Sequence, residues 1–399
     1  MIALVRQNKV ALGFILPFFP LYLGELGVSD QAMGIIWSIA AMTSMLQLPL
    51  GRVSDKLGCR RLILLTALIV IALSGLAIPY VTSIFLLSFL VILFSENGIA
   101  RSLVENLSGA EVSAMARKGE EGKALSSLRF FRPAGIVLVS LGGVWLAQKT
   151  SLQYIFTIVV GIQFVAILGI LFMAPGATLQ TTTSAAEKTK VRIGKDKVLW
   201  AFVVAMVLFH VANAPQGIYF GLYMVRDLGF TETFIASAIL LDMFAWLLIV
   251  LPVGWLADRY GLRPLLFTCW VLLVFKTVII ATASDMWLIV FAKIIDGISN
   301  GMFAVLAALW MVARLGGRER AGEAHAIVGT SLVFGSALGP ALVSFIVDDL
   351  GYPNLFLLLG AIAFVATLIL FAVPEATNRK AAPSSLTITQ SSSSPPESS

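Results

Sequence analysis

The sequence is divided into twelve apolar runs, each separated from the next by a short polar segment. At a rise of about 1.5 Å per residue, a helix of about 20 apolar residues crosses the roughly 30 Å hydrocarbon core of a bilayer. With 58% hydrophobic and only 13% charged residues, the chain lacks the polar surface of a soluble domain. We therefore predict an all-α membrane protein with twelve transmembrane helices, at residues 9–26, 31–50, 62–81, 83–107, 124–147, 152–173, 198–224, 232–254, 264–283, 286–312, 322–347 and 353–373.

The positions of lysine and arginine predict how the chain crosses the membrane. Loops rich in these residues stay on the cytoplasmic side. If the N-terminus is cytoplasmic, the outer loops contain only Lys149 and Arg226, whereas the inner segments carry most of the other basic residues. We therefore expect a multi-pass protein of a plasma or bacterial inner membrane, with both termini in the cytoplasm. The basic inner loops also account for the net charge of +6 without a nucleic-acid partner.

A polar motif that follows the second apolar run recurs after the eighth. In each copy two glycines, an aspartate and two basic residues stand at the same spacing. The first copy consists of Gly51, Asp55, Lys56, Gly58 and Arg60, and the second of Gly254, Asp258, Arg259, Gly261 and Arg263. Because each copy lies between the second and third runs of a six-run half, we infer that one half of the chain duplicates the other.

This duplication predicts the domain organisation. The two halves, residues 1–173 and 198–373, are expected to be six-helix bundles. Residues 174–197 are polar, rich in threonine and basic, as is typical of a flexible cytoplasmic linker. Residues 374–399 are rich in serine and proline and are predicted to be a disordered cytoplasmic tail.

The doubled motif, G-x-x-x-D-[RK]-x-G-x-[RK], resembles the loop signature of the major facilitator superfamily. The resemblance extends over essentially the whole chain, and the apolar first run, "GFILPFFPLYL", is similar to the drug-exporter branch. It implies two pseudo-symmetric six-helix bundles with a substrate site between them near the bilayer midplane, and alternating access by rocking of the bundles. The chain departs from the family in its fourth run, where "FSENG" replaces an R-x-x-Q-G pattern.

The chemistry of the motif indicates a conformational latch. In each copy we expect the first glycine to permit close helix contact, and the aspartate to lie against the positive end of a helix in the other half. The second glycine would allow a tight turn, and the basic residues would hold the loop at the anionic inner surface. Such contacts form only when the cytoplasmic side is closed. The alternative, an ordinary positive inner loop, explains the basic residues but not the recurring aspartate and glycines.

Polar residues at membrane depth are costly and are therefore candidates for substrate binding or proton coupling. Asp296 and His210 are expected near the midplane, and Asp296 is the predicted proton carrier. The alternative role of His210 is structural. The alternative role of the charged residues in the tenth run is to neutralise one another locally. The full set of candidates is Asp296, His210, Lys293, Asn213, Gln216, Asn300, Glu96, Asn97 and Arg101.

Two other charged residues receive a structural interpretation. Asp242 in the eighth run and Lys276 in the ninth fall at similar expected depths. We interpret them as a structural ion pair. Alternatively, the two are not paired, and the ammonium group of Lys276 reaches the membrane surface.

The sequence favours transport over catalysis. It contains no G-x-x-x-x-G-K-[ST] nucleotide loop, no H-E-x-x-H and no C-x-x-C, so we expect no enzyme activity, cofactor or metal. The predicted function is secondary active transport, as proton-coupled export of amphipathic compounds by a monomer in the lipid bilayer. Lys293 and Arg101 fit the alternative, an importer of a polar or anionic metabolite. A transport-inactive scaffold or sensor is a third possibility, but it would not need charges at membrane depth.

Overall fold

The fold is helical throughout the part of the chain that the structure describes. This computed structural model describes residues 27–46, 49–50, 60–81, 83–94, 98–104, 196–315 and 321–374, together with isolated positions elsewhere. The α-helices of these residues are α3 (Asp30–Thr43), α5 (Arg60–Ala77), α6 (Ile84–Phe94), α10 (Lys197–Arg226), α11 (Glu232–Val250), α12 (Pro252–Tyr260), α13 (Leu262–Thr282), α14 (Met286–Arg314), α15 (Ala321–Ser344) and α16 (Val347–Phe371). Short 3-10 helices follow α3 and α5, at Ser44–Leu46 and Ile78–Tyr80.

Within the described residues, seven helices are long and apolar enough to cross a membrane. This confirms an all-α membrane protein. The predicted first, fifth and sixth spans lie outside the described residues except for isolated positions, as do nearly all of the linker and the tail. The number of twelve spans therefore stays a prediction.

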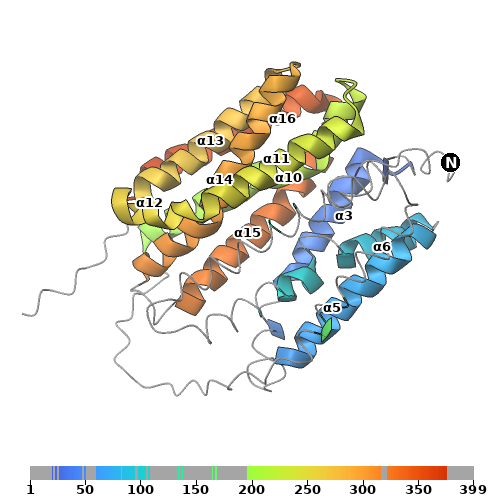
Figure 1. The fold of residues 1–399 in the computed structure, drawn as a ribbon, viewed down its shortest axis with the longest axis horizontal. Coiled ribbons are helices and arrows are strands. Elements are labelled where there is room, and N and C mark those ends of the chain that lie inside the picture. Colours follow the sequence, from blue (N-terminus) through green and yellow to red (C-terminus); the bar gives the residue numbers. More distant parts are fainter. Residues whose placement is uncertain are drawn as a thin grey trace, which may run out of the picture.

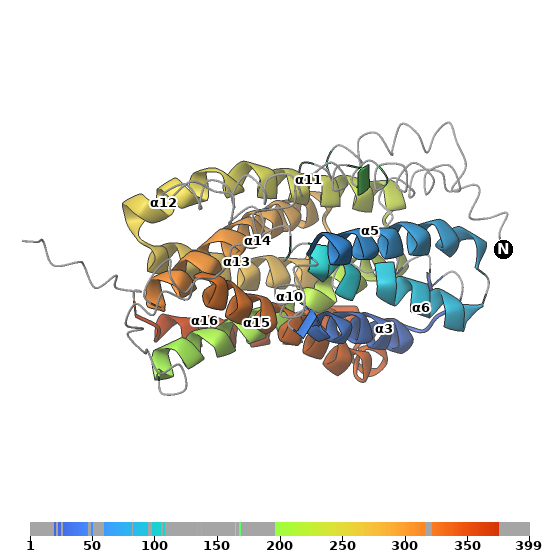
Figure 2. The ribbon, with the colours of Figure 1, turned by 90° about the horizontal axis from the view of Figure 1, so that it is seen from below.

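The described helices fall into two groups (Figure 1). Figure 1 shows α3, α5 and α6, in blue and cyan, to one side of the helices that follow residue 196. Within the second group α10 packs against α15 and α16, and α14 packs against α11 and α13. The main described contact between the groups is α3 against α15, which Figure 2 shows from below.

Glycine pairs set the closest approach between helices. On α14, a Cβ atom at Gly297 would lie 2.0 Å from the backbone oxygen of Asp242, and one at Gly301 would lie 2.5 Å from Ile249 Cγ2. These two glycines form a G-x-x-x-G pattern, which is common where membrane helices cross in close contact. The absence of side chains at these positions therefore lets α11 lie directly against α14.

Glycines also allow close contact of α10 with α15 and of α15 with α3. Cβ atoms at Gly335 and Gly339 of α15 would lie 2.5 Å and 2.6 Å from the backbone oxygens of Val207 and Val211. On α3, a Cβ atom at Gly34 would come within 2.8 Å of three atoms of α10 and α15. Close backbone packing thus continues from the second half of the chain into the first.

The second copy of the repeated motif is mostly helix, not loop. A break after α11 precedes Pro252, which has no N–H to donate and is tolerated at the start of α12. Gly261 then makes the predicted tight turn into α13, with φ at +85°. No described atom lies within 4 Å of the position that the Cβ of Gly254 would take, and the close helix contact expected there stays a prediction.

The basic residues of this copy contact their own half of the protein. Arg259 lies over the rings of Trp255 and Tyr260, at 5.4 Å and 5.6 Å. Arg263 donates a hydrogen bond of 2.8 Å to the backbone oxygen of Phe371, at the end of α16. The side chains of Asp258 and of the first copy, Gly51, Asp55, Lys56, Gly58 and Arg60, lie outside the described parts. The latch therefore stays a prediction.

The first turn of α10 is fixed by Asp196, which lies just before the helix. Its carboxylate accepts hydrogen bonds of 3.1 Å from the backbone N–H groups of Val198 and Leu199. Arg314 at the end of α14 donates two further bonds of 2.9 Å to it. Chiefly through the hydrogen bond from Arg314, the pKa of Asp196 lies below its ordinary value. The carboxylate thus ties together the ends of two helices.

Gly297→Ala is expected to destabilise the α11–α14 contact, because the new methyl group would collide with a backbone oxygen that cannot rotate away. Overpacking of this kind costs about 1–3 kcal/mol. Thermal unfolding of the purified protein in detergent should show a lower midpoint than the wild type. Gly329→Ala on α15 is the matched control, since the space around Gly329 is open. An equal loss of stability in both variants would contradict the close contact.

A second prediction concerns the pH dependence of stability. Because the pKa of Asp196 is lower in the folded protein, its contribution to stability is present above the unfolded aspartate pKa of about 3.9. That contribution is lost as the pH falls through the folded pKa. Asp196→Asn keeps a capping oxygen but loses an ion pair worth about 0.2–1 kcal/mol. Its melting midpoint should be below that of the wild type at neutral pH and converge with it in acid.

The control for this prediction is Asp285→Asn. Asp285 caps α14 in the same way, through hydrogen bonds from Trp287 and Leu288, and the structure describes no ion pair for it. The control should unfold like the wild type at every pH. If the Asp196→Asn variant differs from the wild type by the same amount at neutral and acid pH, the ion pair is not the cause.

Candidate functional site

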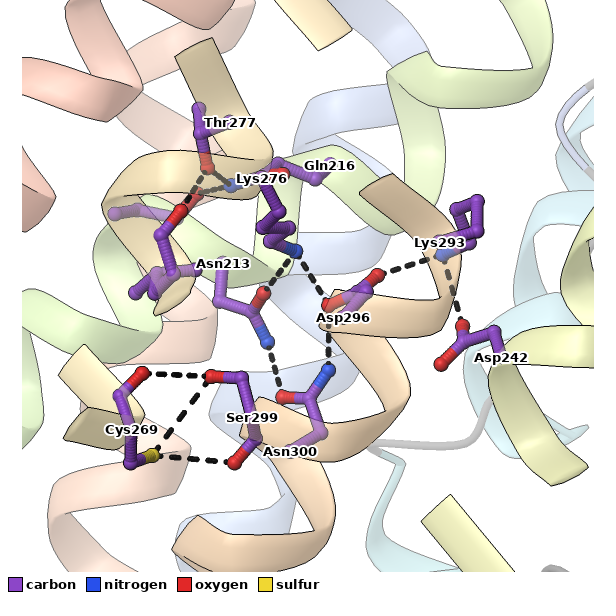
Figure 3. Close-up of polar contacts among 12 residues, drawn as sticks. Asn213, Gln216, Asp242, Cys269, Lys276, Thr277, Lys293, Asp296, Ser299 and Asn300 are labelled. Atoms are coloured by element: carbon purple, nitrogen blue, oxygen red, sulfur yellow. Dashed lines mark hydrogen bonds and ion pairs between the residues drawn. The ribbon is translucent and has the colours of Figure 1, made fainter. Parts of the chain in front are cut away.

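Six polar side chains from four helices meet in the interior of the second half, and we call them the polar network. Figure 3 shows them around Asp296, with α14 contributing three of the six. The members are Asn213 on α10, Asp242 on α11, Lys276 on α13, and Lys293, Asp296 and Asn300 on α14. The four charged side chains are each at most 9% exposed. The network therefore holds charges away from both lipid and water.

The spacing along α14 explains why its three members meet. Lys293, Asp296 and Asn300 are separated by three and four residues, so they lie on one face of the helix. The side of α14 that carries Gly297 and Gly301 packs against α11. This close packing brings Asp242 of α11 within reach of the same face.

Asp296 is the centre of the network. Its Oδ1 accepts hydrogen bonds from Lys276 Nζ at 2.5 Å and from Asn300 Nδ2 at 2.7 Å. Its Oδ2 accepts one from Lys293 Nζ at 2.6 Å. Both oxygens are thus occupied, and two of the three donors are ammonium groups. Such donors favour the ionised carboxylate.

Lys293 connects this centre to a second carboxylate. Its Nζ lies 2.8 Å from Asp242 Oδ2 and 5.1 Å from the centre of the Phe220 ring. Asp242 Oδ1 is buried and has no hydrogen-bond partner among the described residues. Two aspartates and two lysines balance in formal charge, as a buried set of charges requires.

The interpretation of Asp242 and Lys276 as a structural pair was wrong. Lys276 is fully buried, so its ammonium does not reach the membrane surface, and it pairs with Asp296 instead of Asp242. The expected depth of the two residues in the membrane was not enough to predict these pairs, because the rotation of each helix about its axis decides which aspartate a lysine faces. Both residues belong to the network.

Two carboxamides form the accessible edge of the network. Asn213 accepts a hydrogen bond of 2.9 Å from Lys276 Nζ and donates one of 2.9 Å to Asn300 Oδ1. Both asparagines are only half-buried, unlike the charged members.

Gln216 and His210, the other candidates on α10, lie outside the network. Gln216 donates to Thr277 Oγ1 and to the backbone oxygen of Ala212, both at 2.9 Å. His210 is packed edge-on against Phe209 and Phe303, with ring centres 5.3 Å and 4.8 Å away. Its Nε2 is buried, and no described group forms a hydrogen bond with it. The structure thus does not bring His210 to Asp296.

The candidates in the first half are only partly described. Glu96 and Asn97 lie outside the described residues. Arg101 belongs to the described segment 98–104 and is half-buried. Their roles stay predictions.

Sequence reasoning missed a polar contact between the halves. Arg226 at the end of α10 donates hydrogen bonds of 2.8 Å and 3.0 Å to the carboxylate of Asp30, the first residue of α3. Arg226 also donates to the hydroxyl of Tyr352 at 3.0 Å, and that hydroxyl in turn donates to Asp30. Tyr219 donates to the backbone oxygen of Asp30 at 3.1 Å. One indication of this contact was present in the sequence, because Arg226 is one of two basic residues in the predicted outer loops.

Comparison with known proteins identifies the family. A sequence profile of the MFS_1 like family matches residues 10–358. The chain belongs to this family. It is therefore a transporter of the major facilitator superfamily, as the doubled motif predicted. The family also places it among multi-pass integral membrane proteins.

Curated relatives of this transporter include drug-efflux proteins. It is 25% identical over 360 residues to the multi-drug resistance efflux pump PmrA of Streptococcus pneumoniae, covering 87% of this chain and 88% of the pump. It is 25% identical over 387 residues to the multidrug resistance protein MdtG of Proteus mirabilis, covering 90% and 92%.

Solved structures share the fold of this transporter. The D-xylose-proton symporter has a TM-score of 0.72 at 14% identity, covering 95% of this chain and 96% of the symporter. The nucleoside transporter NupG has a TM-score of 0.69 at 15% identity, covering 93% and 98%.

The charge balance of the network predicts how its variants fold. Asp296→Asn leaves two lysines with one aspartate, and an unbalanced buried charge of this kind costs about 3–5 kcal/mol. The double variant Lys276→Met/Asp296→Asn restores the balance, because Lys293 keeps Asp242. We expect the single variant to unfold at a lower temperature than the wild type in detergent, and the double variant to recover most of the loss. A double variant that is less stable than the single one would contradict the balanced network.

Proposed function

We propose that this transporter couples the movement of protons to the export of amphipathic compounds, and that the polar network is its coupling site. The observation that carries the proposal is the set of four balanced charges buried among four membrane helices. One charged side chain at the centre of a membrane helix costs about 2.5–3.5 kcal/mol on insertion scales. A fold that needed only stability would have apolar residues there.

The half-buried carboxamides support a role in which the network meets a solute. Asn213 and Asn300 are bonded both to each other and to the charged members. A solute that binds to these amides would therefore change the hydrogen bonds of Lys276 and Asp296. This is a physical link between substrate binding and the charge state of the network.

The contact between the halves supports alternating access. The Asp30–Arg226–Tyr352 contact joins the start of α3 to the end of α10 and to α16. In the predicted orientation this is the outer end of the molecule, where a conformation closed to the outside requires contact between the halves. The second copy of the repeated motif lies at the opposite end of α11, and the described contacts of Arg259 and Arg263 are within the second half.

Export is favoured over import by the efflux relatives, which match the chain over most of its length. Uptake of a polar solute together with protons is the second candidate, and the accessible amides Asn213 and Asn300 favour it. A scaffold or sensor that does not transport a solute would not require balanced charges buried in its interior. The partners in this proposal are a small-molecule substrate, protons and the lipid bilayer, with a monomer as the working unit.

The direction of the pH gradient separates the two transport modes. We expect liposomes that contain the purified protein to accumulate ethidium, an amphipathic cation, when the interior is acidic, because protons leaving would be exchanged for the cation. Accumulation of uridine or xylose with an acidic exterior would instead identify a symporter of polar solutes. Accumulation of none of these probes under either gradient would reject the proposal.

The Lys276→Met/Asp296→Asn protein is the control that tests the site. Its charges remain balanced, so it should fold and insert, but it should not accumulate the probe under either gradient. Wild-type accumulation by this variant would show that the Lys276–Asp296 pair takes no part in coupling.

A further inference from the structure

We propose that Asp242 is the proton-binding group of the network and that Asp296 is its permanent anion. The proposal rests on the proposed function, in which the network couples protons to transport. It replaces the expectation from sequence that Asp296 carries the proton.

The two carboxylates differ in how their oxygens are occupied. Asp296 accepts three hydrogen bonds through both oxygens, from Lys276, Lys293 and Asn300. Asp242 has a single described partner, Lys293, on Oδ2, and its Oδ1 is buried with no partner. No donor stabilises a negative charge on a buried carboxylate oxygen that has no partner, whereas protonation of a saturated carboxylate would displace at least one donor and weaken the other bonds. A proton entering the network therefore binds at Asp242 Oδ1.

The other charges near Asp242 support this assignment. Lys293 is the lysine that faces it, and Asp296, which shares Lys293, is a second negative charge close by. Lys276 on α13 is directed to Asp296 and Asn213, so it does not neutralise Asp242 directly. When two carboxylates compete for one ammonium group, the carboxylate that accepts fewer hydrogen bonds is protonated first.

Protonation at Asp242 has a defined structural consequence. Asp242 is the network's only member on α11, and Lys293 is its link to the rest. When Asp242 becomes neutral, that ion pair is lost, while Lys293 keeps its bond to Asp296. The packing of α11 against α14 at Gly297 and Gly301 then remains without the ion pair.

The same step predicts the class of substrate. With Asp242 ionised the four charges cancel, and with Asp242 protonated the network carries one excess positive charge. A cation in contact with Asn213 and Asn300 would therefore bind more weakly to the protonated form than to the ionised form. Protons and an amphipathic cation would compete, which is the thermodynamic requirement for exchange of one for the other.

Infrared difference spectroscopy of the purified, full-length protein in lipid tests the proton site without any substrate. Acidification should produce a C=O stretching band of a protonated, buried carboxyl group. We expect this band to be lost in Asp242→Asn, an isosteric mimic of the protonated side chain, and to persist in the Lys276→Met/Asp296→Asn protein. Asp285→Asn, at the exposed cap of α14, should leave the band unchanged.

Two outcomes would overturn the assignment. One is a band that persists in Asp242→Asn, and the other is a band that disappears only when Asp296 is replaced. If Asp242→Asn does not fold, Asp242→Glu gives the answer, because a longer carboxyl must change the frequency or the titration midpoint of the band. An unchanged band in Asp242→Glu would also reject Asp242.

Transport measurements separate this inference from the proposed function. In liposomes, Asp242→Asn should lose ethidium accumulation driven by an acidic interior, whereas exchange of ethidium for ethidium should persist with a lower affinity and without dependence on pH. If the wild type does not transport ethidium, the export proposal fails, while the infrared band still tests Asp242. If the wild type does transport it and Asp242→Asn responds to the gradient like the wild type, the proton assignment fails alone.

Discussion

The ion pair between Lys276 and Asp296 is the interaction on which the rest of the second half depends. Its atoms lie 2.5 Å apart in the membrane interior, where neither charge has water as an alternative partner. Lys276 is fully buried, so the fold has to supply a counter-charge at one position of a neighbouring helix. The rotation of α13 relative to α14 is thereby fixed, and the other members of the network arrange around it.

Small residues make this arrangement possible. Gly297 and Gly301 let α11 approach α14, and Gly335 and Gly339 let α15 approach α10. Lipid offers no hydrophobic driving force between helices, so close backbone contact and polar bonds hold such bundles together. The same face of α14 therefore carries both the charged side chains and, next to them, the glycines that bring Asp242 close enough to share Lys293.

Regular features of the chain were predictable because they depend on local composition. Apolar length gave the helices, and the predicted tenth run at 286–312 matches α14 at Met286–Arg314. The spacing of Lys293, Asp296 and Asn300 gave a common face. The turn at Gly261 followed from its place in the motif, and the structure has it at φ +85°. The doubled motif was enough to identify the superfamily.

The pairing of charges was not predictable, because it depends on helix rotation and on contacts between residues distant in the chain. Asp242 and Lys276 were placed at one depth, yet each has a different partner. Asp30 and Arg226 come from different halves and meet only when α3 packs beside the second half. The sequence by itself determined an all-helical membrane transporter with polar groups buried in the helix that became α14. Only the tertiary structure decided which carboxylate is saturated and which has an unpartnered oxygen, since hydrogen-bond occupancy is a property of packed neighbours.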